Sequence, residues 1–142
     1  MNKFLFLPLA LFLSLAACVK GNSATLSAED LQHRRFELVT MNGEPLFAQN
    51  DTSLELSFGA NMHVSGKACN RFVGTAAIEG GKLVMRNAAS TRMFCAESKL
   101  NELEMILFAM FQSGAEVTLD KETLTLEGNG HTLVYARRDL AQ

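Results

Sequence analysis

Hydrophobic and polar residues alternate along several short stretches of this chain. In Leu54 to Phe58 every second residue is apolar, which is typical of a strand with one buried face. Asn42-Gly43, Gly80-Gly81 and Gly128-Asn129-Gly130 stand between stretches and supply the residues that tight hairpin turns need. The pattern predicts strands at residues 36–39, 54–58, 62–65, 76–79, 82–86, 117–119, 124–126 and 132–135.

The hydrophobic period changes after the fifth predicted strand. From about Glu97 to Gln112, apolar residues recur at steps of three and four, which places them on one face of a helix. Gly114 follows where a glycine commonly ends a helix. Ser27 and Asp30 have the spacing of a capping box, which predicts a short helix that ends near His33. The apolar face of the long helix consists of Leu100, Leu103, Ile106, Leu107, Met110 and Phe111.

These elements predict a fold class. Short connections between strands require antiparallel pairing. The long helix must bury its apolar face against the sheet. We therefore expect an α+β domain, in which an antiparallel, partly barrel-like sheet of about eight short strands packs around one amphipathic helix.

The first residues of the chain have the pattern of an export signal. Met1-Asn2-Lys3 is basic, an apolar run of roughly ten residues follows, and Leu15-Ala16-Ala17 precedes Cys18. A membrane-spanning helix needs about twenty apolar residues, and polar residues begin soon after Cys18. Leu15 to Cys18 resembles the bacterial lipobox, so residues 1–17 are predicted to be a signal peptide and Cys18 to carry the lipid.

The lipid anchor sets an expected location and an expected domain layout. Several acyl chains on one cysteine would hold the protein stably on a membrane. Val19 follows Cys18, which by the usual sorting pattern favours the outer membrane, with the domain facing the periplasm. Residues 18–30 are expected to be the lipidated N-terminus and tether, and residues 31–142 the folded domain.

Composition and charge exclude one class of partner. The formal net charge is −2, and it becomes one unit more negative without Lys3. Arg34-Arg35 and Arg137-Arg138 are isolated pairs, expected at solvated ends of elements, and no basic stripe with interleaved aromatics appears. A nucleic-acid partner is therefore not expected. The membrane, through the N-terminal lipid, is the one partner that the sequence itself indicates.

The cysteine count predicts a disulfide. With Cys18 committed to lipid, Cys69 and Cys95 remain as a pair in an exported domain, where the compartment is oxidising. Closing a loop of about 27 residues would stabilise the fold by about 3.5 kcal/mol on the chain-entropy estimate. A reactive thiol and a metal ligand are the competing interpretations. Zinc sites usually have closely spaced Cys or His pairs, and this chain has none.

Two segments resemble the motifs of a known family. Cys69-Asn70-Arg71-Phe72-Val73-Gly74 is similar to the Cys-Asn-x-aromatic-x-Gly motif of the META domain, and Thr91-Arg92-Met93-Phe94-Cys95 to that family's Thr-x-Met-x-Cys motif. The order and separation also fit, over about residues 30 to 140. Many META domains have an aromatic two residues after the motif glycine, whereas this chain has Ala76.

The resemblance implies a small β-rich domain with one packed helix. It also implies a role in the heat-shock and cell-envelope stress response, with a link to novobiocin resistance. It implies no catalytic residues.

The motif residues have a structural and a functional interpretation. In the structural one, Asn70 caps a turn, Gly74 permits a backbone bend, and Phe72 and Met93 pack beneath a bridge between the two cysteines. In the functional one, a polar rim binds a ligand or a partner. The rim would consist of Asn70, Arg71, Thr91 and Arg92.

The sequence gives little support to catalytic or metal chemistry. Cys69 or Cys95 with His63 could supply a thiol nucleophile, but a disulfide would remove the thiol. His33, His63 and His131 lie far apart in the sequence, on different predicted elements, and favour no metal site. Solvation of a polar helix face accounts for the acidic residues Glu97, Glu102 and Glu104. No cofactor is expected.

The leading hypothesis is a non-enzymatic envelope stress lipoprotein that binds or shields a periplasmic or outer-membrane protein or a small ligand. The alternatives are a small periplasmic thiol enzyme and a structural partner of an outer-membrane assembly.

Overall fold

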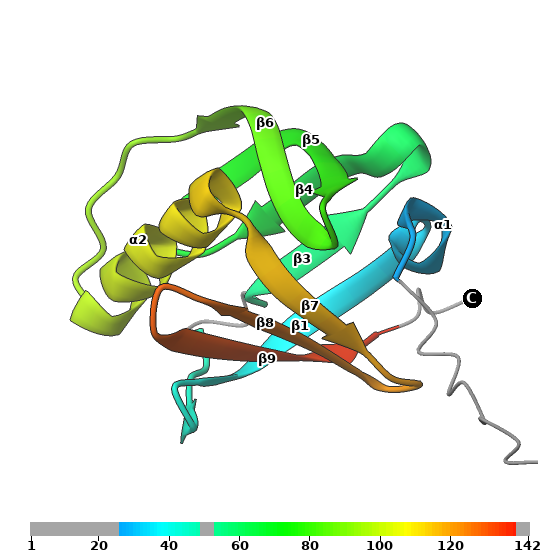
Figure 1. Ribbon diagram of the computed structural model, residues 1–142. Coiled ribbons are helices and arrows are strands. Elements are labelled where there is room, and N and C mark those ends of the chain that lie inside the picture. The colour runs from blue at the N-terminus through cyan, green and yellow to red at the C-terminus, as the bar shows by residue number, and fades with distance from the viewer. Residues whose placement is uncertain (1–25, 49–52, 139–142) are drawn as a thin grey trace, which may run out of the picture.

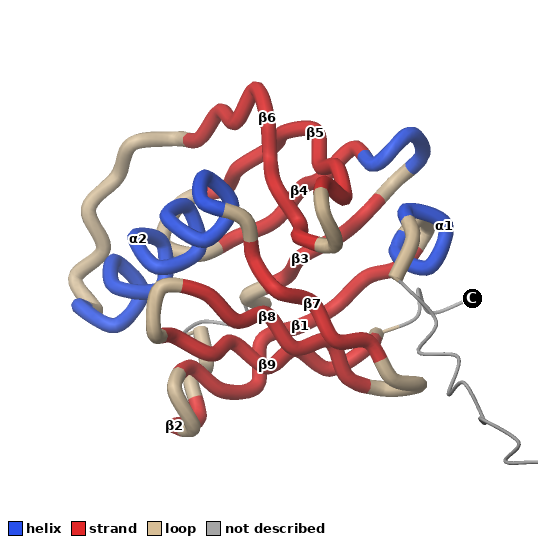
Figure 2. The backbone as a smooth tube through the Cα atoms, in the orientation of Figure 1, coloured by secondary structure: helices blue, strands red, loops and turns tan. Residues whose placement is uncertain are grey.

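The computed structural model describes residues 26–48 and 53–138. Its main body is an antiparallel barrel of eight strands, closed because β1 pairs with β9 as well as with β3 (Figures 1 and 2). The signal peptide, Cys18 and most of the tether predicted above lie outside the described residues. The barrel strands are β1 (Arg34–Met41), β3 (Glu55–Phe58), β4 (His63–Lys67), β5 (Arg71–Glu79), β6 (Lys82–Ser90), β7 (Ala115–Leu119), β8 (Thr123–Gly128) and β9 (His131–Arg137).

The antiparallel α+β architecture predicted from the sequence is confirmed, and the barrel is fully closed. Each strand pairs with the next one along the chain, in the order β1-β3-β4-β5-β6-β7-β8-β9. The ninth strand, β2 (Glu44–Pro45), is a two-residue addition to β1 that the alternation pattern was too short to predict. Closure gives every barrel strand two neighbours, which satisfies backbone groups that an open sheet leaves exposed at its edges.

The two predicted helices are present. The described residues also contain a single turn of 3-10 helix, η1 (Ala60–Met62). The first helix, α1 (Ala28–Leu31), begins with the predicted capping box: Asp30 accepts hydrogen bonds from the backbone and hydroxyl of Ser27. These bonds lower the pKa of the Asp30 carboxyl. The long helix, α2 (Ser98–Ser113), ends at Gly114, whose φ is +93° and whose N–H donates to the Met110 carbonyl at 2.8 Å.

Helix α2 lies beside the barrel where two strands diverge. Strands β6 and β7 pair through only two residue pairs, Lys82 with Glu116 and Leu83 with Ala115. The helix lies next to β5, β6 and β8 in Figure 1, and its predicted apolar face is buried, apart from the partly exposed Leu100. It therefore completes the hydrophobic core on the side that β6 and β7 leave open.

Strands β5 and β6 are longer than the alternation predicted. Strand β5 begins at Arg71, inside the cysteine motif, and β6 continues to Ser90. The register shifts between Val73 and Thr75, opposite Asn87, which adopts a φ of +52°. This bulge interrupts the two-residue period. The long hairpin carries both motif segments to the same end of the domain as the start of α2.

Candidate functional site

The two motif segments meet at a disulfide. Cys69 lies in the turn between β4 and β5, and Cys95 lies in the segment that joins β6 to α2. The structure contains the predicted bond between them, with their Cα atoms 5.8 Å apart. We call residues 91–97 the stapled loop, because this bond ties it to the β4–β5 turn. Among the described residues no group of His, Cys, Asp and Glu side chains is arranged to hold a metal ion.

Asn70 holds the stapled loop against the barrel. Its side chain is buried, 3% exposed, and makes four hydrogen bonds. Oδ1 accepts from the Thr91 hydroxyl at 3.0 Å and from the Met93 N–H at 2.7 Å. Nδ2 donates to the Met93 carbonyl at 3.0 Å and to Glu104 Oε2 at 2.9 Å. The side-chain amide thus uses all of its donors and acceptors.

Two side chains of α2 fix the other side of the loop. Glu104 accepts from the backbone N–H of Asn70 at 2.9 Å, in addition to the amide bond. Asn101 accepts from the Cys95 N–H at 3.1 Å and donates to the Cys95 carbonyl at 2.8 Å. The loop is therefore bound to the barrel turn and to the helix at once. Sequence reasoning missed both roles, since an acidic and an amide residue on a polar helix face carry no signal of their own.

The side chain of Phe72 is buried, whereas that of Met93 is exposed. Phe72 is 1% exposed and its ring packs edge-on against Phe108 at a centroid distance of 5.4 Å. It also lies over Gly66, where a Cβ atom would stand 2.5 Å from the ring. Met93 is 67% exposed, so the expectation that it packs beneath the disulfide is wrong. The backbone bonds to Asn70 engage both peptide groups of Met93 and leave its side chain outside the core.

The predicted polar rim is only partly present. Asn70 is buried and does not form part of an exposed rim, whereas Thr91 is exposed but donates its hydroxyl proton to Asn70. Arg71 and Arg92 are exposed, and within the described residues neither has an ion pair or a side-chain hydrogen bond. The rim hypothesis therefore retains two arginines, one on each motif segment.

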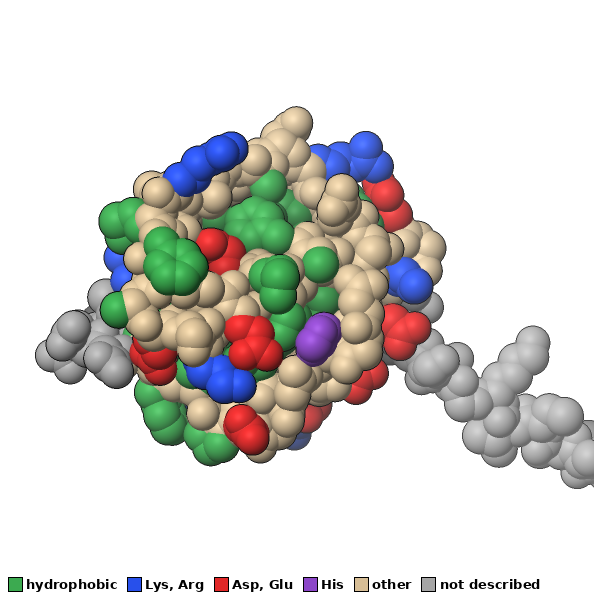
Figure 3. Space-filling view, turned by 90° about the vertical axis from the view of Figure 1, so that its left-hand side faces the viewer, with side chains coloured by type: hydrophobic (Ala, Val, Ile, Leu, Met, Phe, Trp, Pro, Cys, Tyr) green, Lys and Arg blue, Asp and Glu red, His purple; other side chains and the backbone are tan. Residues whose placement is uncertain are grey.

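The stapled loop instead presents apolar side chains. Phe94 is 89% exposed and Met93 67% exposed, and Met105 on α2 is 68% exposed. Figure 3 looks at this side of the domain and shows apolar side chains reaching the surface at several places between acidic ones. The sequence motif contains Met93 and Phe94, but only the structure shows that they point outwards.

The histidines and the acidic residues named in the sequence analysis lie at different places in the domain. His131 forms a hydrogen bond to Asn42 at 2.9 Å, whereas His33 and His63 line one groove together with Arg34, Arg35 and Arg138. Glu102 pairs with Lys99 at 3.3 Å. Glu97 Oε2 is buried and has no hydrogen-bond partner among the described residues. Both sulfurs are in the disulfide, so the structure offers no free thiol at Cys69 or Cys95 for the alternative thiol nucleophile.

The comparisons with known proteins agree with this geometry. The model of the META domain family matches residues 29–140. Heat shock protein HslJ of Escherichia coli K12 is 40% identical over 131 residues, which cover 92% of this chain and 93% of that protein. A protein solved by NMR shares 40% identity with a TM-score of 0.72, over 78% of this chain and 94% of its own.

A more distant structure shares the fold alone. An NMR structure of a protein from Burkholderia xenovorans is 21% identical with a TM-score of 0.61, over 78% of this chain and 86% of its own. No helix within residues 26–48 and 53–138 is both long and apolar enough to cross a membrane. The family model and the identity to HslJ cover nearly the whole chain, and the two cysteine motifs lie within them. The chain therefore belongs to the META domain family, in its heat-shock-related, HslJ-like branch.

Proposed function

We propose that this protein is a non-enzymatic lipoprotein of the outer membrane that acts in the heat-shock and envelope stress response. Its signal sequence and Cys18 support attachment to the membrane, with the domain facing the periplasm. Membership of a heat-shock-related family supports the stress role. The proposal includes a contribution to novobiocin tolerance, as the family resemblance implies.

The stapled loop is proposed as the surface through which the domain binds a protein partner. One observation carries this: Phe94, a large apolar side chain, is 89% exposed on a segment fixed by a disulfide and by Asn70 and Asn101. Aromatic residues, methionine and arginine are enriched at protein interfaces, and Arg92, Met93 and Phe94 are consecutive here. A fixed loop loses little conformational entropy on binding, which favours affinity.

A complementation experiment tests this proposal. Cells that lack the gene receive the wild type, Phe94→Ala or Phe47→Ala, and growth is scored under heat and under novobiocin. Phe47 is the matched control, because it is 72% exposed but lies after β2, outside the stapled loop. We expect Phe94→Ala to fail and Phe47→Ala to complement at equal protein levels. A null strain that grows like the wild type, or full rescue by Phe94→Ala, would contradict the proposal.

Cross-linking identifies the partner class. A photoreactive residue at position 94 should trap one abundant envelope protein, while the same residue at position 47 should trap none. A defined outer-membrane product would support the narrower proposal of a structural partner in an outer-membrane assembly. The absence of a cross-linked product at position 94 would contradict the docking role of the loop.

The alternative of a thiol enzyme has a separate test. Thiol titration of the denatured mature protein, isolated from the periplasm without reductant, counts free cysteines. The disulfide between Cys69 and Cys95 leads us to expect none. Two reactive thiols would favour the enzyme over the binding module.

A further inference from the structure

Arg34 and Arg35 meet Arg138, which is distant in the sequence, at one groove. The groove has a volume of about 410 Å³ and lies beside the start of β1 and the residue that follows β9. We call it the cationic groove. Its polar lining consists of His33, Arg34, Arg35, Ser57, His63, Ser65 and Arg138. Phe58 and Gly59 complete the lining. None of the described residues that line the groove is acidic, so its polar side chains carry guanidinium, hydroxyl and imidazole groups.

The floor of the cationic groove is a row of polar side chains across three strands. Arg35 of β1 is the register partner of Ser57 of β3, which in turn is the register partner of Ser65 of β4. Register partners project from the same face of a sheet. Neither serine hydroxyl forms a hydrogen bond within the part of the chain that the structure describes. The row therefore offers two hydroxyl donors beside a guanidinium.

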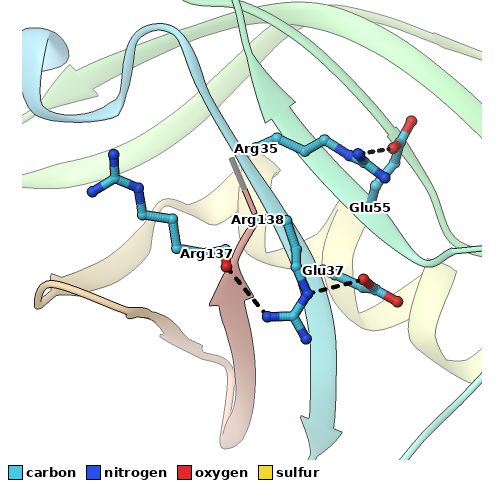
Figure 4. A network of polar contacts seen from close by, with 5 residues as sticks. All are labelled: Arg35, Glu37, Glu55, Arg137 and Arg138. Carbon is cyan, nitrogen blue, oxygen red and sulfur yellow. Dashed lines mark hydrogen bonds and ion pairs between the residues drawn. The ribbon is translucent and has the colours of Figure 1, made fainter. Parts of the chain in front are cut away.

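Ion pairs behind the groove hold two of its arginines in place. Arg35 Nε lies 2.9 Å from Glu55 Oε2, and Arg138 Nε lies 3.4 Å from Glu37 Oε2 (Figure 4). Arg138 also donates its backbone N–H to the Arg35 carbonyl at 2.8 Å, which joins the end of the chain's last strand to β1. These carboxylates use part of each guanidinium and leave other N–H groups for a ligand.

The third arginine carries charge without such a pair. Arg34 has no ion pair within 4.0 Å among the described residues, and it acts on Asp30 of α1 only through longer-range electrostatics. Asp30 is itself engaged by the hydrogen bonds from Ser27. Planar guanidinium groups and hydroxyls are the groups that bind phosphate oxygens well. The donor set therefore fits a phosphate.

The position of the groove indicates where that phosphate comes from. Leu26, which packs on the core, lies eight positions after Cys18, so the tether spans at most about 28 Å. Leu26 lies two positions before α1, and His33, which lines the groove, lies two positions after it, so the tether enters the domain beside the groove. Figure 1 shows α1 and the end of β9 on the same side of the barrel.

We propose that the cationic groove binds the phosphate of an anionic phospholipid headgroup in the membrane that holds the protein. This orientation rests on the lipid attachment proposed above, whereas the phosphate binding itself does not. The groove then faces the bilayer, and the stapled loop, at the other end of the domain, faces away from it. The domain would then bind the membrane through the cationic groove and a partner protein through the stapled loop.

Vesicle binding of the mature chain tests the proposal. The protein is residues 18–142 with Cys18→Ser, so that no lipid contributes, and each variant is checked for an unchanged circular dichroism melt. Vesicles contain phosphatidylglycerol and phosphatidylcholine in equal parts, or phosphatidylcholine alone. We expect co-sedimentation with the first and not with the second. Loss of one arginine contact at a membrane surface should weaken binding about fivefold, so Arg34→Gln should show that loss.

Two variants distinguish specific binding in the groove from non-specific electrostatic attraction to the membrane. Lys99→Gln removes one positive charge from the start of α2, outside both the cationic groove and the stapled loop, and should bind like the wild type. The double variant Ser57→Ala, Ser65→Ala removes the floor hydroxyls without changing charge and should weaken binding. Equal weakening by Arg34→Gln and Lys99→Gln, or unchanged binding of the serine variant, would overturn the proposal.

Inorganic phosphate distinguishes the source of the ligand. In a titration followed by NMR, saturable shifts of the Ser57 and Ser65 amides should appear, and excess phosphate should displace the protein from vesicles. Shifts with free phosphate but no vesicle binding would overturn the headgroup assignment. None of these measurements involves Phe94 or the lipid anchor on Cys18, so failure here leaves the complementation test of the proposed function unaffected.

Discussion

At the scale of single residues, Asn70 explains why the first motif has an amide after its cysteine. The side chain lies between the Met93 peptide groups and Glu104, and it must both accept from an N–H and donate to a carbonyl and a carboxylate. Among the short side chains only asparagine has two donors and an acceptor in this arrangement. Aspartate would place a second carboxylate beside Glu104. The motif asparagine is therefore structural, and its effect on any partner passes through the loop that it holds.

Replacing Asn70 should destabilise the fold strongly. Asn70→Ala removes four side-chain hydrogen bonds and leaves buried groups without partners, so we expect the free energy of unfolding to fall by about 3 kcal/mol. Thr91→Ala removes only one of the four bonds and should cost about 1 kcal/mol. Urea unfolding measures both. Equal losses in the two variants would show that the amide is not the centre of the network.

At the scale of elements, the β5–β6 hairpin depends on the motif glycine. A Cβ atom at Gly74 would lie 2.8 Å from the Met85 side chain and 3.1 Å from the Arg86 carbonyl oxygen. These contacts come from β6, which pairs with β5 and approaches it closely beside the bulge at Asn87. The predicted reason for Gly74 was a backbone bend, whereas the structure shows that a close approach between strands also requires it. The hairpin must keep this geometry to deliver the stapled loop to α2.

Gly74→Ala should therefore cost about 1 to 3 kcal/mol of unfolding free energy, because the added methyl group overpacks a tight contact. Gly59→Ala is the matched control. The nearest atom to its Cβ position, the His63 carbonyl oxygen, is 3.6 Å away, and its φ of −93° is accessible to alanine. Thermal melts of both variants provide the comparison. A Gly74→Ala protein as stable as Gly59→Ala would show that β6 moves freely.

At the scale of the whole molecule, the closed barrel places one ionisable group deep in the core. Tyr135, the only tyrosine, is 2% exposed on β9, and its strand pairs with both β1 and β8. Burial raises the pKa of the Tyr135 phenol well above its usual value. Forming the phenolate therefore requires the barrel to open.

The fold should lose stability at alkaline pH for this reason. Below the ordinary tyrosine pKa of about 10, the phenol is protonated in both the folded and the unfolded chain. Ionisation of Tyr135 then takes nothing from the free energy of unfolding. As the pH rises above about 10 the unfolded chain releases the proton first, so stability falls by about 1.4 kcal/mol per pH unit. Phenolate absorbance should rise together with the loss of circular dichroism. Tyr135→Phe should show a weaker alkaline decline, and an identical decline would assign the effect to other groups.

The sequence by itself determined the features that depend on neighbours along the chain. The alternation at 54–58, the three- and four-residue steps of α2, the capping box at Ser27 and the glycine after the helix all predicted elements that are present, because period and capping are local properties. The two remaining cysteines predicted the disulfide from their count and compartment. The two motif segments also pointed to the META family.

The tertiary structure alone decided which distant residues share a surface. Closure of the barrel, the burial of Asn70 and the exposure of Met93 and Phe94 depend on contacts between segments separated by twenty residues or more, as in the 23-residue separation of Asn70 and Met93. Arg34-Arg35 and Arg137-Arg138 are isolated pairs in the sequence, and three of the four arginines line one groove because β1 pairs with β9. A side chain's partners across a sheet follow from register, and register is set by the packing of the whole core.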